Sequence, residues 1–117
     1  MVKQIAILGS TGSIGRNAIE VIDALGPGYR IFALTAHSNV QLLADQVRRY
    51  RPRFVAVTDS DRAPELGEML ADLDVEILVG PDALTTIAQI DEVDVVLAAV
   101  VGAAGLPALL AAARKGK

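Results

Sequence analysis

A short apolar run that leads directly into a glycine-rich loop is the feature that most constrains the fold. Residues 5–8 (Ile-Ala-Ile-Leu) are typical of a strand buried on both faces, and a helical pattern begins at Ser13. Between them stand Gly9, Gly12 and Gly15. Strand, tight turn and helix in this order predict the first unit of a fold with a parallel sheet.

The glycine loop predicts a binding site for a nucleotide phosphate. Gly9 suits a sharp turn, Gly12 lets backbone N–H groups approach a pyrophosphate, and Gly15 lets the helix pack closely on the strand. The free N–H groups and the positive end of the helix dipole would then face the anion. The side chains expected to add hydroxyl donors are Ser10, Thr11 and Ser13. Because the spacing is G-x-x-G-x-x-G rather than G-x-G-x-x-G, a tight turn without a ligand is the alternative.

Strands and helices alternate along the rest of the chain. Apolar periodicity predicts further strands over 29–36, 54–58, 75–79 and 93–101. It predicts helices over 13–25, 40–50, from a cap at 59–61 to about 71, 83–89 and 106–114. The inward face of the first helix is expected to carry Ile14, Ala18, Ile19, Val21, Ile22 and Leu25. The alternation predicts one α/β domain over 1–117, a Rossmann-like, doubly wound, mainly parallel sheet with helices on both faces.

The sequence is expected to be the N-terminal part of a larger protein. Arg114 and Lys115 followed by Gly116 are typical of the end of a helix. In a doubly wound fold, another strand should follow such a helix.

Composition excludes several functional classes. With 11 basic and 14 acidic residues the net charge is −3, so no positive field attracts nucleic acid or an anionic membrane. The absence of cysteine excludes disulfides, thiolate metal sites and a cysteine nucleophile within this sequence. No apolar run is long enough for a membrane span and no signal peptide is recognisable, so we expect a cytoplasmic protein. With one histidine and scattered acids, we assign no catalytic residue and no metal ligand.

The end of the second predicted strand favours NADP over NAD. Domains specific for NAD place an acid there to accept hydrogen bonds from the ribose 2′-OH. Here the residues are Thr35, Ala36, His37, Ser38 and Asn39, none of them acidic. Their hydroxyl, imidazole and amide groups can donate to a 2′-phosphate, which a carboxylate would repel. In the alternative interpretation, His37 is merely an exposed loop residue and Asn39 a helix cap.

A second loop of small residues, 102–105 (Gly-Ala-Ala-Gly), follows the fifth predicted strand. Ligands of open α/β sheets bind outside the carboxyl ends of the strands, so this loop leaves room for the nicotinamide ribose. Close packing of a helix on the sheet is the alternative.

Three segments in register resemble the 1-deoxy-D-xylulose 5-phosphate reductoisomerases. They are 9–15 (Gly-Ser-Thr-Gly-Ser-Ile-Gly), 36–39 (Ala-His-Ser-Asn) and 98–105 (Ala-Ala-Val-Val-Gly-Ala-Ala-Gly), the last followed by Arg-Lys-Gly-Lys at 114–117. The resemblance covers the whole chain and corresponds to the family's N-terminal NADPH-binding domain. It implies a homodimeric parent enzyme that uses NADPH and a divalent metal (Mg²⁺ or Mn²⁺). That enzyme isomerises and reduces 1-deoxy-D-xylulose 5-phosphate to 2-C-methyl-D-erythritol 4-phosphate for isoprenoid precursors, on the non-mevalonate pathway.

The resemblance also assigns cofactor contacts by position. They are Thr11, Gly12, Ser13 and Ile14 at the pyrophosphate, His37, Ser38 and Asn39 at the adenosine phosphate, and Ala99 on the nicotinamide side. Many members carry Gly-Lys at the positions of His37 and Ser38, which leaves open which group meets the 2′-phosphate here. The family's metal ligands, substrate-binding residues and catalytic flap lie beyond Lys117, so the resemblance implies that this fragment alone is inactive.

Two other interpretations remain open at this point. One is another NADP-dependent oxidoreductase with the same glycine spacing, such as a relative of the semialdehyde dehydrogenases with a downstream cysteine nucleophile. The other is a non-catalytic nucleotide-sensing module.

Overall fold

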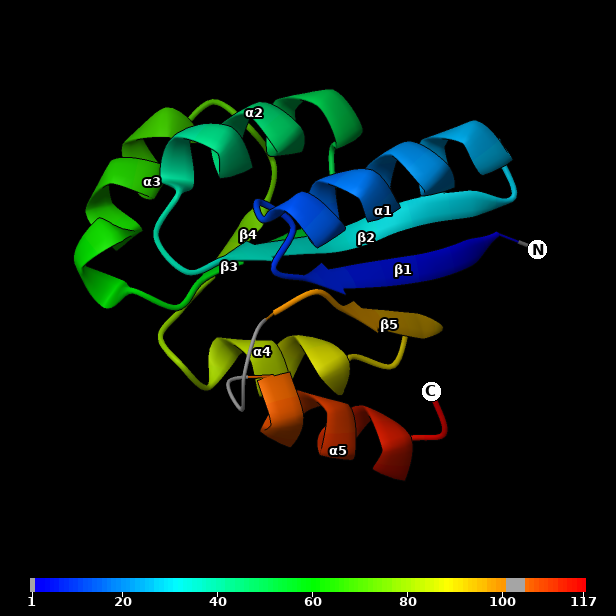
Figure 1. Ribbon diagram of the computed structural model, residues 1–117. Helices are drawn as coiled ribbons and strands as arrows, with labels where there is room; N and C mark the ends of the chain where they lie inside the picture. The colour runs from blue at the N-terminus through cyan, green and yellow to red at the C-terminus, as the bar shows by residue number, and fades with distance from the viewer. Residues whose placement is uncertain (1, 101–104) are drawn as a thin grey trace.

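The computed structural model describes residues 2–100 and 105–117 (Figure 1). The elements are β1 Lys3–Leu8, α1 Ser13–Leu25, β2 Tyr29–Ala36, α2 Val40–Tyr50, β3 Phe54–Val57, the 3₁₀ turn η1 Ser60–Arg62, α3 Ala63–Met69, β4 Glu76–Val79, α4 Ala83–Ala88, β5 Val95–Ala98 and α5 Leu106–Arg114. The order and type of the predicted elements are confirmed.

Several predicted elements are shorter than expected, and local hydrogen bonds account for two of them. The strand expected over 93–101 spans Val95–Ala98 in the described residues, because the Val93 N–H donates to the Ile90 carbonyl in the turn after α4. The helix expected to run to about residue 71 begins as η1, which the Asp59 side chain caps by accepting from the Asp61 N–H at 3.1 Å. Pro64 in the first turn then favours the start of α3.

The five described strands form one parallel sheet in the order β4-β3-β2-β1-β5. Strands β1, β2, β3 and β4 lie side by side in chain order, with β4 at one edge of the sheet. Strand β5 pairs with the other side of β1. The strand order therefore reverses at β1, and ligands of such sheets bind beside this reversal, outside the carboxyl ends of the strands.

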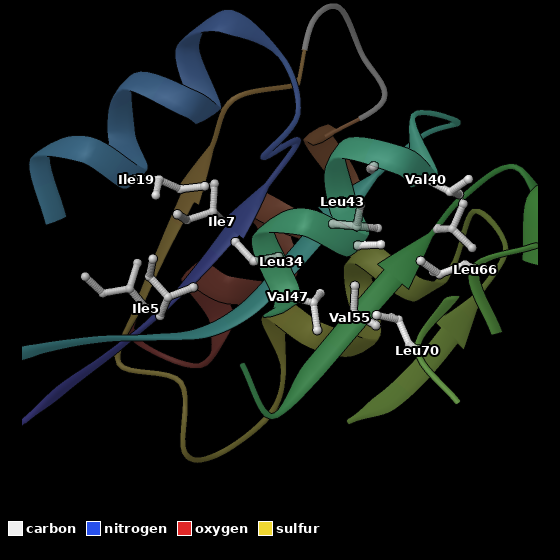
Figure 2. Close-up of a cluster of buried hydrophobic side chains, with 14 of the residues drawn as sticks. Ile5, Ile7, Ile19, Leu34, Val40, Leu43, Val47, Val55, Leu66 and Leu70 are labelled. Atoms are coloured by element: carbon white, nitrogen blue, oxygen red, sulfur yellow. The ribbon is translucent and has the colours of Figure 1, made fainter. Parts of the chain in front are cut away.

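Helices cover both faces of the sheet, as predicted. Helices α1, α2 and α3 lie on one face, and α4 and α5 lie on the other (Figure 1). Alternation along β1 explains the two layers, because Ile5 and Ile7 point to the first face and Ala6 and Leu8 to the second. Figure 2 shows the first layer, whose labelled side chains are Ile5, Ile7, Ile19, Leu34, Val40, Leu43, Val47, Val55, Leu66 and Leu70.

The predicted inward face of α1 is partly wrong. Ile19 and Ile22 are buried against the sheet, but Ile14, Val21 and Leu25 are 63%, 60% and 55% exposed. The apolar residues of this helix form two neighbouring stripes, each with helical spacing of three and four residues. The buried stripe is Gly15, Ile19 and Ile22. It can face the sheet because glycine has no side chain to hold the start of the helix away.

Candidate dinucleotide-binding site

The turn between β1 and α1 requires glycine at two positions. Gly9 has φ +83°, and a Cβ there would lie 2.8 Å from Val100 Cγ1 and 3.1 Å from the Ala99 carbonyl carbon. A Cβ on Gly15 would overlap the Gly9 carbonyl oxygen and lie 2.7 Å from Ser10 Cα. The first turn of α1 thus packs directly on the loop, so the close approach expected at Gly15 is made to Gly9 and Ser10 rather than to the strand itself.

Hydrogen bonds to buried side chains hold the loop in place. The Thr35 hydroxyl oxygen accepts from the Gly9 N–H at 2.8 Å, and the Thr35 carbonyl accepts from the Ser10 N–H at 2.8 Å. The Ser10 hydroxyl donates to Gln46 Oε1 at 2.7 Å, and Gln46 Nε2 donates to the Ser10 carbonyl at 2.9 Å. All three residues are buried. The expectation that Ser10 offers its hydroxyl to a phosphate is therefore wrong, because that group is committed inside the protein.

Sequence reasoning missed Gln46. The only available signal was a polar residue on the inward side of the helix over 40–50, between the buried Leu43 and Val47. Its partner lies 36 residues away in the sequence, so no local pattern could identify it.

The N-terminus of α1 has backbone donors without a side-chain cap. Gly12 is the N-cap residue with extended backbone, and no side chain in the described part of the chain caps it. By contrast, Asn39 caps α2 by accepting from the Leu42 N–H at 3.2 Å. Among the described residues, a Cβ on Gly12 would have only the Gly9 oxygen within 4 Å, at 3.9 Å, so none of them fills the space beside Gly12. N–H groups that no described side chain caps, together with the positive dipole end, suit an anion such as a diphosphate.

A cavity of about 500 Å³ lies at the carboxyl ends of the strands. Its lining residues are Gly9, Thr11, Gly12, Thr35, Ala36, His37, Thr58, Pro81, Leu84, Ala99 and Val100. Of the eight residues predicted to contact a cofactor, the cavity brings together Thr11, Gly12, His37 and Ala99. The other four, Ser13, Ile14, Ser38 and Asn39, do not line it. The mainly apolar wall with polar groups at the glycine loop is typical of a small-molecule site.

The predicted second loop falls mostly outside the described residues. Only Gly105 of the segment 102–105 is described, and a Cβ there would overlap the Val100 side chain. This contact agrees with the alternative of close packing for Gly105.

The end of β2 carries a hydrogen-bonded histidine. His37 is exposed, and its Nδ1 lies 2.8 Å from the Thr58 hydroxyl oxygen, which leaves Nε2 for another partner. Asp59, two residues after β3, donates its N–H to the His37 carbonyl at 2.9 Å and caps η1 with one carboxylate oxygen. Residues 35–39 themselves contain no carboxylate side chain.

The described residues do not fit a metal ion. Over 2–100 and 105–117, no three His, Cys, Asp or Glu side chains come together in a group that could hold one. In the same two segments, no helix has the length and apolar character needed to cross a membrane.

Comparisons with known proteins agree with these features. A family described as 1-deoxy-D-xylulose 5-phosphate reductoisomerase matches residues 5–117. Relatives of that name include one from Moorella thermoacetica, 47% identical over 100% of this chain and 30% of its own length. Another, from Methylococcus capsulatus, is 51% identical over 98% of this chain and 30% of its own length.

Solved structures of similar proteins show the same fold. A 1-deoxy-D-xylulose 5-phosphate reductoisomerase from Zymomonas mobilis in complex with NADPH has a TM-score of 0.93 at 39% identity, over 100% of this chain and 31% of that one. A DOX-P reductoisomerase in complex with magnesium has a TM-score of 0.94 at 40% identity, over 100% of this chain and 30% of that one.

The chain spans about 30% of the length of the relatives it matches. The family match extends over nearly all of its residues, which decides against a relative of the semialdehyde dehydrogenases. This chain belongs to the 1-deoxy-D-xylulose 5-phosphate reductoisomerase family.

Proposed function

We propose that residues 1–117 form the N-terminal NADPH-binding domain of an enzyme that isomerises and reduces 1-deoxy-D-xylulose 5-phosphate to 2-C-methyl-D-erythritol 4-phosphate. The observation that carries the proposal is the uncapped, glycine-lined N-terminus of α1, which stands beside a cavity at the carboxyl ends of parallel strands. The names of the relatives and the NADPH complex of a similar structure support it.

The strand order sets the orientation of the proposed cofactor. Because β1 lies between β2 and β5, a dinucleotide with its diphosphate at the end of β1 extends in both directions. The adenosine half would lie over the end of β2, near His37, Ser38 and Asn39. The nicotinamide half would lie over the end of β5, near Ala99. The diphosphate would take the N–H groups and hydroxyls of the segment 11–14.

The proposal includes a preference for NADPH over NADH. Asn39 Oδ1 already accepts from the Leu42 N–H, so its amide nitrogen is left to donate to a 2′-phosphate. His37 Nε2 and the Ser38 hydroxyl are further groups of the kind that bind phosphate. These groups replace the carboxylate that would accept from the 2′-OH of NADH.

The proposed reaction needs more than this chain. When bound, NADPH supplies the hydride, and the residues of this chain hold its diphosphate and fix its two halves across β1. No step through a metal ion follows from the described residues, because they offer no suitable ligand group. Homodimer assembly of the whole protein rests on the family resemblance, and its cytoplasmic location rests on the sequence pattern; both belong to the same proposal.

Calorimetric titration with NADPH and NADH tests the preference. We expect NADPH to bind roughly tenfold more tightly or better, as for charge-assisted hydrogen bonds to one phosphate. The variant His37→Asp should lose this preference, because its carboxylate repels a 2′-phosphate and accepts from a 2′-OH. The variant His37→Asn, which adds no charge, is the matched control. Equal or tighter binding of NADH by the unmodified chain would refute the proposed preference.

A further inference from the structure

Gln46 is a buried polar side chain whose two functional groups both serve one residue of the glycine loop. It lies on the inward side of α2 and is 7% exposed. A buried amide is unfavourable unless its donor and acceptor are both satisfied. Here the Gln46 carbonyl oxygen accepts from the Ser10 hydroxyl and its amide nitrogen donates to the Ser10 carbonyl. The amide therefore closes a ring of two hydrogen bonds around Ser10.

This ring fixes the direction of a backbone donor in the loop. The Ser10 carbonyl and the Thr11 N–H belong to the same planar trans peptide unit, so they point in opposite directions. Because the Ser10 carbonyl is held toward α2 by Gln46, the Thr11 N–H is held facing away from α2. Thr11 and Gly12 both line the cavity. The side chain of Gln46 thus determines the orientation of the first peptide of the proposed diphosphate loop.

Helix α2 also joins the two halves of the proposed site. Its N-cap, Asn39, belongs to the proposed adenosine-phosphate segment, and Gln46 lies seven residues further along, about 10 Å away by helical rise. The loop is tied a second time by the hydrogen bond that the Ser10 N–H donates to the Thr35 carbonyl at 2.8 Å. One rigid helix therefore sets the spacing between the two phosphate-binding segments.

We propose that Gln46 is a positioning residue for the cofactor diphosphate and that it acts through Ser10. This inference rests on the proposed function, because it assumes that the loop binds a dinucleotide. We expect no direct contact between Gln46 and the cofactor, because Gln46 does not line this cavity and both its amide oxygen and its amide nitrogen are hydrogen-bonded to Ser10.

The variant Gln46→Met tests the inference. Methionine has a similar length and volume but cannot hold the Ser10 peptide. We expect the dissociation constant for NADPH to rise at least tenfold in Gln46→Met, measured by calorimetry. Gln41 lies on the same helix and is exposed, so Gln41→Met is the matched control and should bind NADPH like the unmodified chain.

A second ligand separates positioning from general loosening of the fold. Adenosine 2′-monophosphate has the phosphate of the adenosine half but no diphosphate, and NMR titration of amide shifts follows its binding. We expect Gln46→Met to bind it with an unchanged dissociation constant. If both ligands weaken by the same factor, the effect is not specific to the diphosphate loop and the inference is overturned.

A further variant covers the case in which Gln46→Met does not fold. Gln46→Glu keeps the shape and the acceptor for the Ser10 hydroxyl but loses the donor to the Ser10 carbonyl. We expect it to weaken NADPH at least tenfold and to leave adenosine 2′-monophosphate unchanged. Normal NADPH binding by a folded variant at position 46 overturns the inference alone. Failure of the unmodified chain to bind NADPH overturns the proposed function.

Discussion

Replacing Gly15 by alanine should destabilise the fold, although alanine is the better helix former. The new Cβ would overlap the Gly9 carbonyl oxygen and lie 2.7 and 2.9 Å from the Ser10 Cα and carbonyl carbon. These are backbone atoms, so no side-chain rotation relieves the overlap. The loop cannot move away freely either, because the buried Thr35 and Gln46 hold it by hydrogen bonds. Helix α1 must therefore shift away from the loop.

The size of the effect follows from two opposing contributions. Overpacking of a well-packed site destabilises by about 1–3 kcal/mol, and a backbone overlap belongs at the upper end. Replacing glycine by alanine inside a helix returns about 1 kcal/mol. We expect a net loss of about 2 kcal/mol in the free energy of unfolding, or a fall of roughly 8 °C in Tm for a domain of this size.

Gly67→Ala is the matched control for this experiment. Gly67 lies inside α3, and in the described part of the chain a Cβ there would meet no heavy atom within 4 Å beyond its chain neighbours and its own helix backbone. The same substitution should therefore stabilise by about 0.5–1 kcal/mol. Urea unfolding followed by circular dichroism measures both variants. If Gly15→Ala is as stable as Gly67→Ala, the close packing of α1 on the loop plays no part in stability and the reasoning is wrong.

Three further predictions concern the site. Gly12→Val should leave the fold intact, because a Cβ at Gly12 meets, of the residues the structure describes, only the Gly9 oxygen at 3.9 Å, yet it should abolish NADPH binding by filling the space for the diphosphate; calorimetry that shows normal binding by the folded variant would contradict this. Asn39→Ala removes the cap of α2 and should lower the free energy of unfolding by about 1 kcal/mol in urea titrations, and no change would show that this cap is unimportant. The purified chain should not oxidise NADPH with 1-deoxy-D-xylulose 5-phosphate and Mn²⁺. Its described residues offer no metal site to hold the substrate, and positioning of the reactants alone contributes roughly 7–11 kcal/mol to catalysis. Metal-dependent loss of NADPH absorbance above a no-protein control would disprove this prediction.

Local patterns predicted most of the fold. The bounds of α1, β2, α2 and α5 agree with those expected from apolar periodicity and from caps such as Asn39, because these signals lie within the segment itself. The short strand β5 was predicted too long, since Val93 is apolar and buried but its N–H closes a turn.

Features set by distant contacts could not be predicted. Nothing within α1 tells which of its two apolar stripes faces the sheet, and the choice depends on how Gly15 packs against the loop. The place of Ser10 in a glycine loop predicts a phosphate donor, but its hydroxyl donates to Gln46 instead. Of the eight residues predicted at the cofactor, four line one cavity, since the carboxyl ends of parallel strands meet at one edge of the sheet.

The position of β5 in the sheet has a consequence for self-association. It pairs with β1 on one side, and among the described residues no strand covers its other side. Its four residues, Val-Val-Leu-Ala, include no charged residue and no proline, so of the devices that usually keep open strand edges from pairing with other molecules, β5 has its short length. Two copies of this chain can therefore join edge to edge through backbone hydrogen bonds at high concentration. Dilution, rather than cooling, is the condition expected to keep the purified chain monomeric.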